Sequence, residues 1–189
     1  MIAAIACINL DGALGLDNKL LYNNAMDMRR FKSLSTQYYH CIMGRNTFES
    51  LPKPLENRET LIVSSTYENK KIEQPLDIST ANANLCILTY EQLLYMLKLK
   101  NTSYLVCGGA KLYETMLPMC DILHLTIVYD HAKGDAYFPK LNNAEWHVSE
   151  CSTMIKTPSG YTMQFVDLHR RKTLQDILHS EHTNLFKQI

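Results

Sequence analysis

The sequence predicts a single-domain α/β protein with a mostly parallel central sheet, antiparallel strands at one edge and about four flanking helices. Short apolar segments alternate with helix-like segments along most of the chain, a pattern typical of parallel strands joined by crossover helices. The last three apolar segments follow one another without helices between them, and this indicates antiparallel additions at one edge. A chain of 189 residues can form one core without disulfides or metals.

Each predicted strand is a short apolar run. The run at the N-terminus has no basic region before it and is broken by Asn9 and Asp11, so we interpret it as a strand and not as a signal peptide. Strands are predicted over residues 2–8, 39–43, 59–64, 85–88, 103–107, 122–129, 146–151 and 161–168.

The predicted helices depend on capping, glycine and proline signals. Thr89 and Gln92 have the spacing of a capping box. Gly44 opens a short helix, and Pro118 ends the helix that follows Gly109. Besides that last helix, we predict helices over residues 24–35, 44–51 and 90–98.

The remaining segments are predicted as loops and a tail. Residues 11–21 form a polar, glycine-bearing loop, and residues 66–84 form a long polar loop with at most one poor strand. We expect one domain over residues 1–170 and a mildly amphipathic C-terminal extension over 171–189. A helix packed on the body, self-association and disorder remain alternatives for this extension.

The charge of the chain excludes some partners. Nineteen Lys and Arg residues balance 19 Asp and Glu residues, which argues against nucleic acid or a membrane surface as the main partner. No apolar run reaches the roughly 18 residues that a membrane span needs. A small anionic ligand remains possible, because it responds to local charge.

The six cysteines and the histidines give no sign of a metal site. No two cysteines form a CxxC pair, and their spacing does not support zinc. We expect reduced, mostly buried thiols in a cytoplasmic protein. His179 and His182 are three residues apart but have no third ligand near them in the sequence, so we expect exposed histidines and no metal.

Asp27 is the first candidate for a functional residue. It shares one face of the predicted helix with Phe31 and Leu34, at spacings of four and seven residues. An acid on an apolar face is unusual, because an unpaired carboxylate is costly to bury. Two interpretations stay open: a solvent-exposed partner of the helix dipole, or a pocket residue that accepts paired hydrogen bonds from an amino-heterocycle.

Two junctions each join a strand to a helix through glycine. The first contains Gly44 and Arg45, and the second contains Gly108 and Gly109. Helix N-termini attract phosphate, and glycines let it approach the backbone closely. Either junction alone could be a plain helix start, but together they predict one extended ligand with two phosphate sites.

The end of the predicted strand 59–64 bears on the kind of dinucleotide. A site that prefers NAD tends to place an acid near such a strand end. Here the residues are Ser64, Ser65 and Thr66, and Arg45 is available. This combination favours a 2′-phosphate, and therefore NADPH.

In chain order, these segments resemble the dihydrofolate reductase family from residue 2 to about residue 168. The set is highly specific in this order, although each motif alone would be weak. The matching motifs are Ile5-Ala6, residues 11–15, Asp27-Met28, Phe31-Lys32, residues 42–45, residues 47–50, Pro54-Leu55, Arg58, Ser64-Ser65, Gly108-Gly109, Tyr113, Leu125-Thr126, Gly134-Asp135 and Phe138-Pro139.

The resemblance implies where the substrate, dihydrofolate, is bound. Asp27 would bind the 2-amino group and N3 of the pterin, with Thr126 hydrogen-bonded to it directly or through water. Arg58 would form a bidentate pair with the α-carboxylate of the glutamate tail. The catalytic residues would be Asp27, Tyr22 and Thr126. The substrate-binding residues would be Ile5, Cys7, Asp27, Met28, Phe31, Lys32, Leu51, Leu55, Arg58, Cys107, Tyr113 and Thr126.

The resemblance also implies an NADPH site. Residues 14–21 would close over the nicotinamide, Arg45, Ser64 and Ser65 would hold the 2′-phosphate, and the Gly108-Gly109 bond would be cis. The cofactor-binding residues would be Cys7, Leu14, Gly15, Asn18, Leu20, Gly44, Arg45, Asn46, Thr47, Ser64, Ser65, Thr66, Cys107, Gly108, Gly109, Ala110, Lys111, Leu112 and Tyr113.

The implied reaction moves hydride from C4 of the nicotinamide to C6 of dihydrofolate, and a proton reaches N5. Asp27 would lie on the far side of the pterin from N5, so water is the expected proton donor. The family's product supports one-carbon metabolism and thymidylate synthesis. We further expect a monomer that binds antifolates, with no nucleic acid or membrane partner.

The sequence departs from the family pattern at several points. Leu21-Tyr22 stands where Pro-Trp is common, and Ala110 and Lys111 replace the usual third glycine and an arginine. The tyrosine could still hold a water through its hydroxyl.

Two alternatives follow from the same residues. A reductase of the same fold that acts on a riboflavin precursor would lack the acid at position 27 and would have a phosphate site in place of Arg58. A non-catalytic folate or nucleotide binder would show damage to Asp27, the glycine pair or the loop. The sequence keeps all of these features, so both alternatives are disfavoured.

Overall fold

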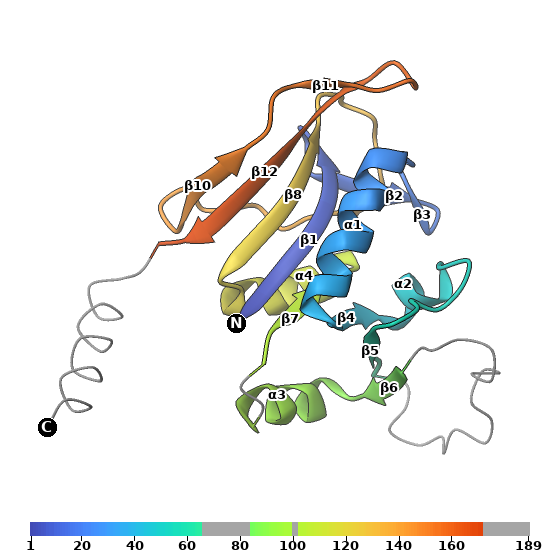
Figure 1. Cartoon of the computed structure of the whole chain (residues 1–189), viewed down its shortest axis with the longest axis vertical. Coiled ribbons are helices and arrows are strands. Elements are labelled where there is room, and N and C mark those ends of the chain that lie inside the picture. The colour runs from blue at the N-terminus through green and yellow to red at the C-terminus, as the bar shows by residue number, and fades with distance from the viewer. Residues whose placement is uncertain (66–83, 100–101, 172–189) are drawn as a thin grey trace, which may run out of the picture.

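The computed structural model describes residues 1–65, 84–99 and 102–171, and the extension predicted over residues 171–189 lies outside them except for Arg171. A main sheet of nine strands has the order β10-β12-β8-β1-β7-β4-β5-β6, with β11 paired to β12 (Figure 1). Its strands are β1 (Ile2–Asn9), β4 (His40–Gly44), β5 (Glu59–Val63), β6 (Asn84–Leu88), β7 (Tyr104–Val106), β8 (Ile122–Val128), β10 (Trp146–Cys151), β11 (Ile155–Lys156) and β12 (Thr162–Arg170).

The strand directions confirm the α/β prediction and correct one part of it. The six adjacent strands β8, β1, β7, β4, β5 and β6 all run parallel to one another. Strand β8 was predicted as an antiparallel addition, but it is parallel to β1 because a helix before it returns the chain to the same end of the sheet. The antiparallel pairs at this edge are β12 with β8, β10 with β12 and β11 with β12.

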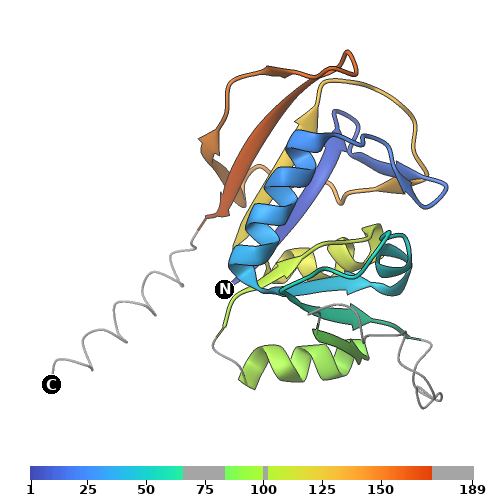
Figure 2. The ribbon, with the colours of Figure 1, turned by 45° about the vertical axis from the view of Figure 1, so that its right-hand side comes forward.

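Within the described residues, four α-helices cover the two faces of the main sheet (Figure 2). They are α1 (Ala25–Tyr38), α2 (Arg45–Glu49), α3 (Tyr90–Leu99) and α4 (Ala110–Met116), and a 3-10 turn, η3 (Leu117–Met119), contains Pro118. One core joins Leu93 of α3 and Met116 of α4 to the sheet. Clusters on the opposite face contain Tyr38 of α1 and Phe48 of α2.

Two helix ends show why these segments fold locally. In α3, the Thr89 N–H donates to Gln92 Oε1 at 2.9 Å and the Gln92 N–H donates to Thr89 Oγ1 at 3.2 Å. The predicted capping box is therefore confirmed. In α1, Asn24 Oδ1 accepts from the Met26 N–H at 2.7 Å, and the helix continues three residues beyond the predicted end, to Tyr38. No described helix is long and apolar enough to cross a membrane.

The segment predicted as a loop over residues 11–21 instead contains two strands. Strands β2 (Ala13–Leu16) and β3 (Lys19–Leu20) form a hairpin, and β9 (Ala136–Tyr137) completes a small sheet with order β3-β2-β9. Asp17 and Asn18 have φ angles of 50° and 58°, as the two central residues of a tight type I′ hairpin turn require. The Asp-Asn pair was the available sequence signal for this hairpin.

Candidate active site

The candidate site lies where the parallel strands of the main sheet end. In open α/β sheets, ligands bind at the carboxyl ends of the strands. The ends of β4 and β5 are in register, with Gly44 opposite Val63. Strand β7 lies between β1 and β4 and leads into Cys107 and Gly108. The two glycine junctions predicted from the sequence therefore meet at one edge.

Asp27 is buried at this edge, and its carboxylate is hydrogen-bonded to a residue of the sheet. It lies in the first turn of α1 and is 6% exposed. Thr126, on β8 and fully buried, donates from Oγ1 to Asp27 Oδ1 at 2.6 Å. The solvent-exposed interpretation of Asp27 is therefore wrong, and the predicted contact with Thr126 is direct.

Burial also sets the chemistry of Asp27. Desolvation raises the pKa of the carboxyl group, while the Thr126 hydrogen bond and the charge of Arg30 act in the opposite direction. The carboxylate is thus a hydrogen-bond acceptor held in a fixed place, with one side-chain hydrogen bond, from Thr126, and the charge of Arg30 nearby. Such a group binds strongly to an N–H donor that arrives with a ligand.

The apolar side chains predicted to wall the substrate come from several elements. Ile5 and Leu55 are 7% and 8% exposed, whereas Cys7, Met28, Phe31 and Leu51 are half-buried. Phe31 and the half-buried Cys107 pack against both clusters on this face, so they join the α1 side of the site to the α2 side.

Arg58 is a buried cation fixed by neighbouring groups. It is 7% exposed, its Nη1 donates to Ser35 Oγ at 2.6 Å, and its Nε donates to the Glu56 carbonyl at 2.9 Å. The predicted bidentate role remains a prediction, but the guanidinium is held rigidly. Lys32, predicted beside it in the substrate site, is exposed on α1.

The two glycine junctions are joined by backbone contacts. The Gly44 N–H donates to the Gly108 carbonyl at 2.7 Å, and the Gly108-Gly109 peptide is cis, as predicted. The Tyr113 hydroxyl donates to the Ile5 carbonyl at 2.5 Å, which ties α4 to β1. A Cβ placed on Gly108 would lie 3.0 Å from that hydroxyl, so the backbone here is tightly enclosed.

The start of α4 faces α2 across a narrow gap. A Cβ on Gly109 would lie 3.0 Å from Thr47 Oγ1, so the hydroxyl of Thr47 lies close to the Gly109 backbone. The first N–H groups of a helix have no partner within the helix. Among the other predicted residues, Leu112 is buried, Ala110 is half-buried, and Asn46 and Lys111 are exposed.

The residues predicted for the 2′-phosphate lie at the ends of β4 and β5. Ser64 is 6% exposed and Ser65 is exposed. The Arg45 side chain is 41% exposed, and its Nε lies 3.3 Å from Glu49 Oε1. An exposed pair of this kind is weak, so Arg45 can turn toward an anion. Thr66, predicted with them, lies outside the described residues.

The segment predicted to cover the nicotinamide is the β2–β3 hairpin. Leu14 is buried, whereas Asn18 and Leu20 are exposed. A Cβ on Gly15 would lie 2.6 Å from the Lys19 carbonyl oxygen, so only glycine fits this position. The Asp17 N–H donates to Asp135 Oδ2 at 3.0 Å, which fixes the hairpin to the segment that carries β9.

Tyr22 follows this hairpin with its hydroxyl already engaged. The hydroxyl donates to Asp130 Oδ2 at 2.7 Å, and Asn9 Nδ2 donates to it at 3.4 Å. Burial and the bond to Asp130 raise its pKa to about 12. The ring packs edge-on against Tyr161, with centroids 5.2 Å apart. The contacts of Tyr22 therefore support an anchor for the hairpin, and its predicted catalytic role is not tested by them.

Sequence reasoning missed several polar residues that hold the site together. Asn9 is 1% exposed, and its side chain accepts from the N–H groups of Asp11 and Ala13 and donates to the Ala132 carbonyl. Its signal was a carboxamide at the end of an apolar strand. Arg30 has no comparable sequence signal, because its partners are more than 90 residues away along the chain.

A cavity of about 470 Å³ lies at the opposite end of the strands. It is lined by Met1, Ile2, Leu97, Lys98, Leu99, Thr102, Tyr104, Met119 and Asp121. The Asp121 carboxylate there accepts from the Ile2 N–H at 2.9 Å. The cavity is therefore separate from Asp27 and the glycine junctions.

Comparison with known proteins identifies the family. The family described as dihydrofolate reductase matches residues 1–170. The chain belongs to the dihydrofolate reductase family. It is 29% identical over 177 residues to the dihydrofolate reductase type 3 of Salmonella typhimurium, covering 91% of this chain and 99% of the relative. It is 29% identical over 154 residues to the dihydrofolate reductase of Bacillus subtilis (strain 168), covering 77% and 80%.

A solved structure supports the fold. The dihydrofolate reductase from Enterococcus faecalis, complexed with NADP(H) and RAB-propyl, superposes with a TM-score of 0.74 at 22% sequence identity. The match covers 91% of this chain and 97% of the other. The predicted dihydrofolate-reductase-like fold is thereby confirmed.

Proposed function

We propose that this dihydrofolate reductase reduces 7,8-dihydrofolate to 5,6,7,8-tetrahydrofolate with NADPH, and that Asp27 holds the pterin. The observation that carries the proposal is the buried Asp27 carboxylate, bound by Thr126 at 2.6 Å, beside the two joined glycine junctions. The family membership supports the reaction. The riboflavin-precursor alternative lacks support, because both Asp27 and Arg58 are in place.

On the substrate side, each polar group has a separate task. Asp27 would accept hydrogen bonds from the 2-amino group and N3 of the pterin, with Thr126 fixing the direction of the carboxylate. Phe31 and Leu55 would contact the rings, and Arg58 would bind the α-carboxylate of the glutamate tail. Because Ser35 and Glu56 already hold Arg58, little order is lost when the tail binds.

On the cofactor side, the residues present fit a dinucleotide with a 2′-phosphate. Gly108 and Gly109 leave the space that a Cβ would fill, and Thr47 presents a hydroxyl beside them. Arg45, with Ser64 and Ser65, supplies a cation and hydroxyl groups. NADPH would supply the hydride, from C4 of its nicotinamide to C6 of the pterin.

The chain's own part in the chemistry is positioning, charge and exclusion of water. Anionic Asp27 would polarise the pterin and favour protonation at N5. It would lie on the far side of the ring from N5, so water is the proposed proton donor. The β2–β3 hairpin, fixed by Asp135 and by Tyr22, would cover the nicotinamide and limit the access of other water.

The finer expectations complete the proposal. We infer that residues 1–170 form the catalytic domain, because the family match spans them, and that the chain acts as a monomer. Antifolates that carry an amino-heterocycle should bind Asp27. All six cysteines are free thiols, which supports the cytoplasm as the compartment. The product would support one-carbon metabolism and thymidylate synthesis.

The test is an assay of NADPH oxidation with the purified full chain. The proposal predicts loss of NADPH absorbance that requires dihydrofolate and stops with methotrexate. Tight methotrexate binding without turnover would instead support the non-catalytic binder. If the chain neither oxidised NADPH nor bound methotrexate, the proposed function would be contradicted.

A further inference from the structure

The inner face of α1 carries a second set of polar contacts, centred on Arg30. The Arg30 side chain is 13% exposed and forms an ion pair with Asp167 of β12. Its Nη1 donates to the Leu125 carbonyl of β8 at 3.1 Å. The guanidinium also lies over the Phe165 ring, 4.9 Å from its centroid. Arg30 therefore joins α1 to both β8 and β12.

The contact with β8 lies beside the residue that binds Asp27. Leu125 directly precedes Thr126, whose hydroxyl donates to Asp27 Oδ1 at 2.6 Å. Asp27 and Arg30 are three residues apart, so they are neighbours on one side of the helix. Two successive residues of β8 thus hold two neighbouring residues of α1. A shift of the helix along the strand would break both contacts together.

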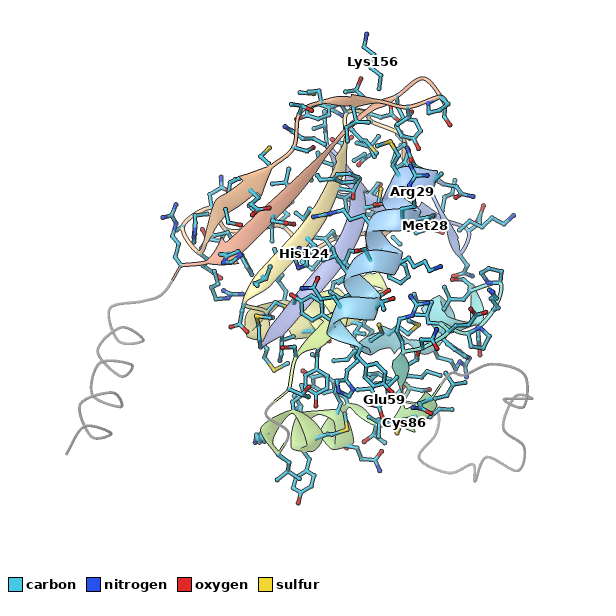
Figure 3. All side chains as sticks on the ribbon, viewed as in Figure 1. Met28, Arg29, Glu59, Cys86, His124 and Lys156 are labelled. Carbon is cyan, nitrogen blue, oxygen red and sulfur yellow. The ribbon has the colours of Figure 1, made fainter. Side chains whose placement is uncertain are left out.

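Asp167 is itself fixed by a chain of contacts that returns to α1. Its Oδ1 lies 2.8 Å from His124 Nδ1, and His124 Nε2 lies 3.2 Å from the hydroxyl of Tyr38. Figure 3 shows His124 on β8 beside α1. Tyr38 is the last residue of α1, so polar contacts bind both ends of the helix to the sheet.

We propose that Arg30 is a positioning residue: anchored by Asp167, it fixes the first turns of α1 on β8, so that the Asp27 carboxylate keeps its place against Thr126 and the pterin. This inference rests on the function proposed above. A buried ion pair is weak evidence for stability, because desolvation offsets most of its attraction. The directed contacts to two strands are therefore better explained by a need for fixed geometry.

The charges around Asp27 give the inference a second consequence. Within the part of the chain that the structure describes, the titratable or charged groups that interact with Asp27 are Arg30 on α1, Cys7 on β1 and Tyr113 on α4. Burial raises the pKa of Cys7 and of Tyr113, and the charge of Asp27 adds to both shifts. Both groups are thus neutral at pH 7, and Arg30 is the cation of this set. Its loss should raise the pKa of Asp27.

The test compares Arg30→Gln and Arg30→Lys with the control Arg29→Gln in the full chain. Arg29 is the adjacent residue on α1 and is exposed (Figure 3). In Arg30→Gln, we expect kcat for dihydrofolate reduction to fall about tenfold, the KM for NADPH to stay unchanged, and the ionisation of Asp27 in the kcat/KM profile to move to higher pH. Arg30→Lys should return the pH profile of kcat/KM close to that of the wild type but should restore kcat less fully. Lysine supplies the positive charge without the forked contacts of arginine. Arg29→Gln should change neither.

A measurement that does not require turnover can test the role of Arg30 separately from the proposed function. Carbon NMR of labelled aspartates, with the Asp27 signal assigned by its loss in Asp27→Asn, follows the carboxyl titration directly. If the wild type does not reduce dihydrofolate, the proposed function is wrong, and the Asp27 titration in Arg30→Gln still tests Arg30. An unchanged kcat together with an unchanged titration would overturn the inference.

A further variant covers the case in which Arg30→Gln does not fold. Asp167→Asn keeps Arg30 but removes its anionic anchor. The inference predicts a loss of kcat in this variant, again without a change in the KM for NADPH. A normal kcat in folded Asp167→Asn would overturn the role given to the anchor and therefore the inference.

Discussion

The substrate half and the cofactor half of the site are held in different ways. In the substrate half, side chains far apart in the sequence meet, and Thr126 binds Asp27 across 99 residues. In the cofactor half, the two glycine junctions are joined through the backbone, where the Gly44 N–H donates to the Gly108 carbonyl at 2.7 Å. The Arg45 side chain, a cation of the cofactor half, is 41% exposed.

This difference matches the ligand part that each half would bind. A pterin offers directed N–H donors, so it needs one acceptor in a fixed place. A diphosphate is a diffuse anion that many N–H groups can bind. The substrate half should therefore be sensitive to the loss of one charge, and the cofactor half to added volume at its glycines.

The largest expected effect tests the substrate half. Asp27→Asn should lower kcat by at least about 100-fold, because the amide keeps the size of the side chain and removes the anion that favours N5 protonation. NADPH binding, followed by fluorescence titration, should stay within about twofold of the wild type. A near-normal kcat would contradict the role of Asp27.

The next effect tests the cofactor half. Gly108 has a φ angle of 107°, and a Cβ there would lie 3.0 Å from the Tyr113 hydroxyl. Gly108→Ala should lower the free energy of unfolding by about 1–3 kcal/mol and weaken NADPH binding.

Gly160→Ala is the matched control for backbone strain. Gly160 has a φ angle of 91°, and nothing lies within 4 Å of a Cβ placed there. This variant should lose stability through strain but bind NADPH normally. Equal losses of NADPH affinity in both variants would contradict the account of the cofactor half.

A smaller and selective effect is expected at Arg45. Arg45→Ala should weaken NADPH binding by about tenfold, a typical loss for one charged hydrogen-bond partner, and should change NADH binding much less, since the proposed partner is the extra phosphate. Lys156→Ala, at an exposed residue of β11, is a control for the loss of one positive charge. If the binding of NADPH and NADH weakened equally, the proposed contact between Arg45 and the 2′-phosphate would be contradicted.

The smallest expected effect is on stability. Because burial raises the folded-state pKa of Asp27, ionising this group destabilises the fold as the pH rises through that pKa. Asp27→Asn should therefore be more stable than the wild type at pH 8, by on the order of 1 kcal/mol. The gain should vanish below about pH 4, the unfolded pKa, where the acid is neutral in both states. Urea unfolding at both pH values measures this difference.

Asp167→Asn should show the opposite sign. Burial raises the pKa of Asp167, but the His124 hydrogen bond and the Arg30 charge outweigh it and lower that pKa overall. Its carboxylate therefore stabilises the fold above the unfolded pKa, and this contribution is lost as the pH falls through the folded pKa. Asp167→Asn should be less stable than the wild type at pH 8, and the difference should shrink in acid. The same sign for both variants would contradict this account.

The two halves also differ in how well the sequence predicted them. The glycine junctions and the Thr89–Gln92 capping box are local patterns, so they were visible from a few adjacent residues. The partner of Asp27, Thr126, is 99 residues away, and spacing on the helix alone did not decide between the two interpretations. Only the resemblance to the family related the two residues before the structure did.

Other features depend on tertiary contacts that have no local signal. The hydroxyl of Tyr22 is engaged by Asp130, 108 residues away. Arg30 looks like any helical arginine until Leu125 and Asp167 are placed beside it. Long-range polar contacts are therefore what the sequence predicted least well here.

The most direct test of the central claim follows the hydride itself. NADPH carrying deuterium in the transferred position at C4 would be incubated with dihydrofolate and the full chain, and the product examined by NMR and mass spectrometry. The account predicts one deuterium at C6 of tetrahydrofolate, formed at least about 100-fold more slowly by Asp27→Asn. Oxidation of the cofactor with no deuterium in the product would contradict the account.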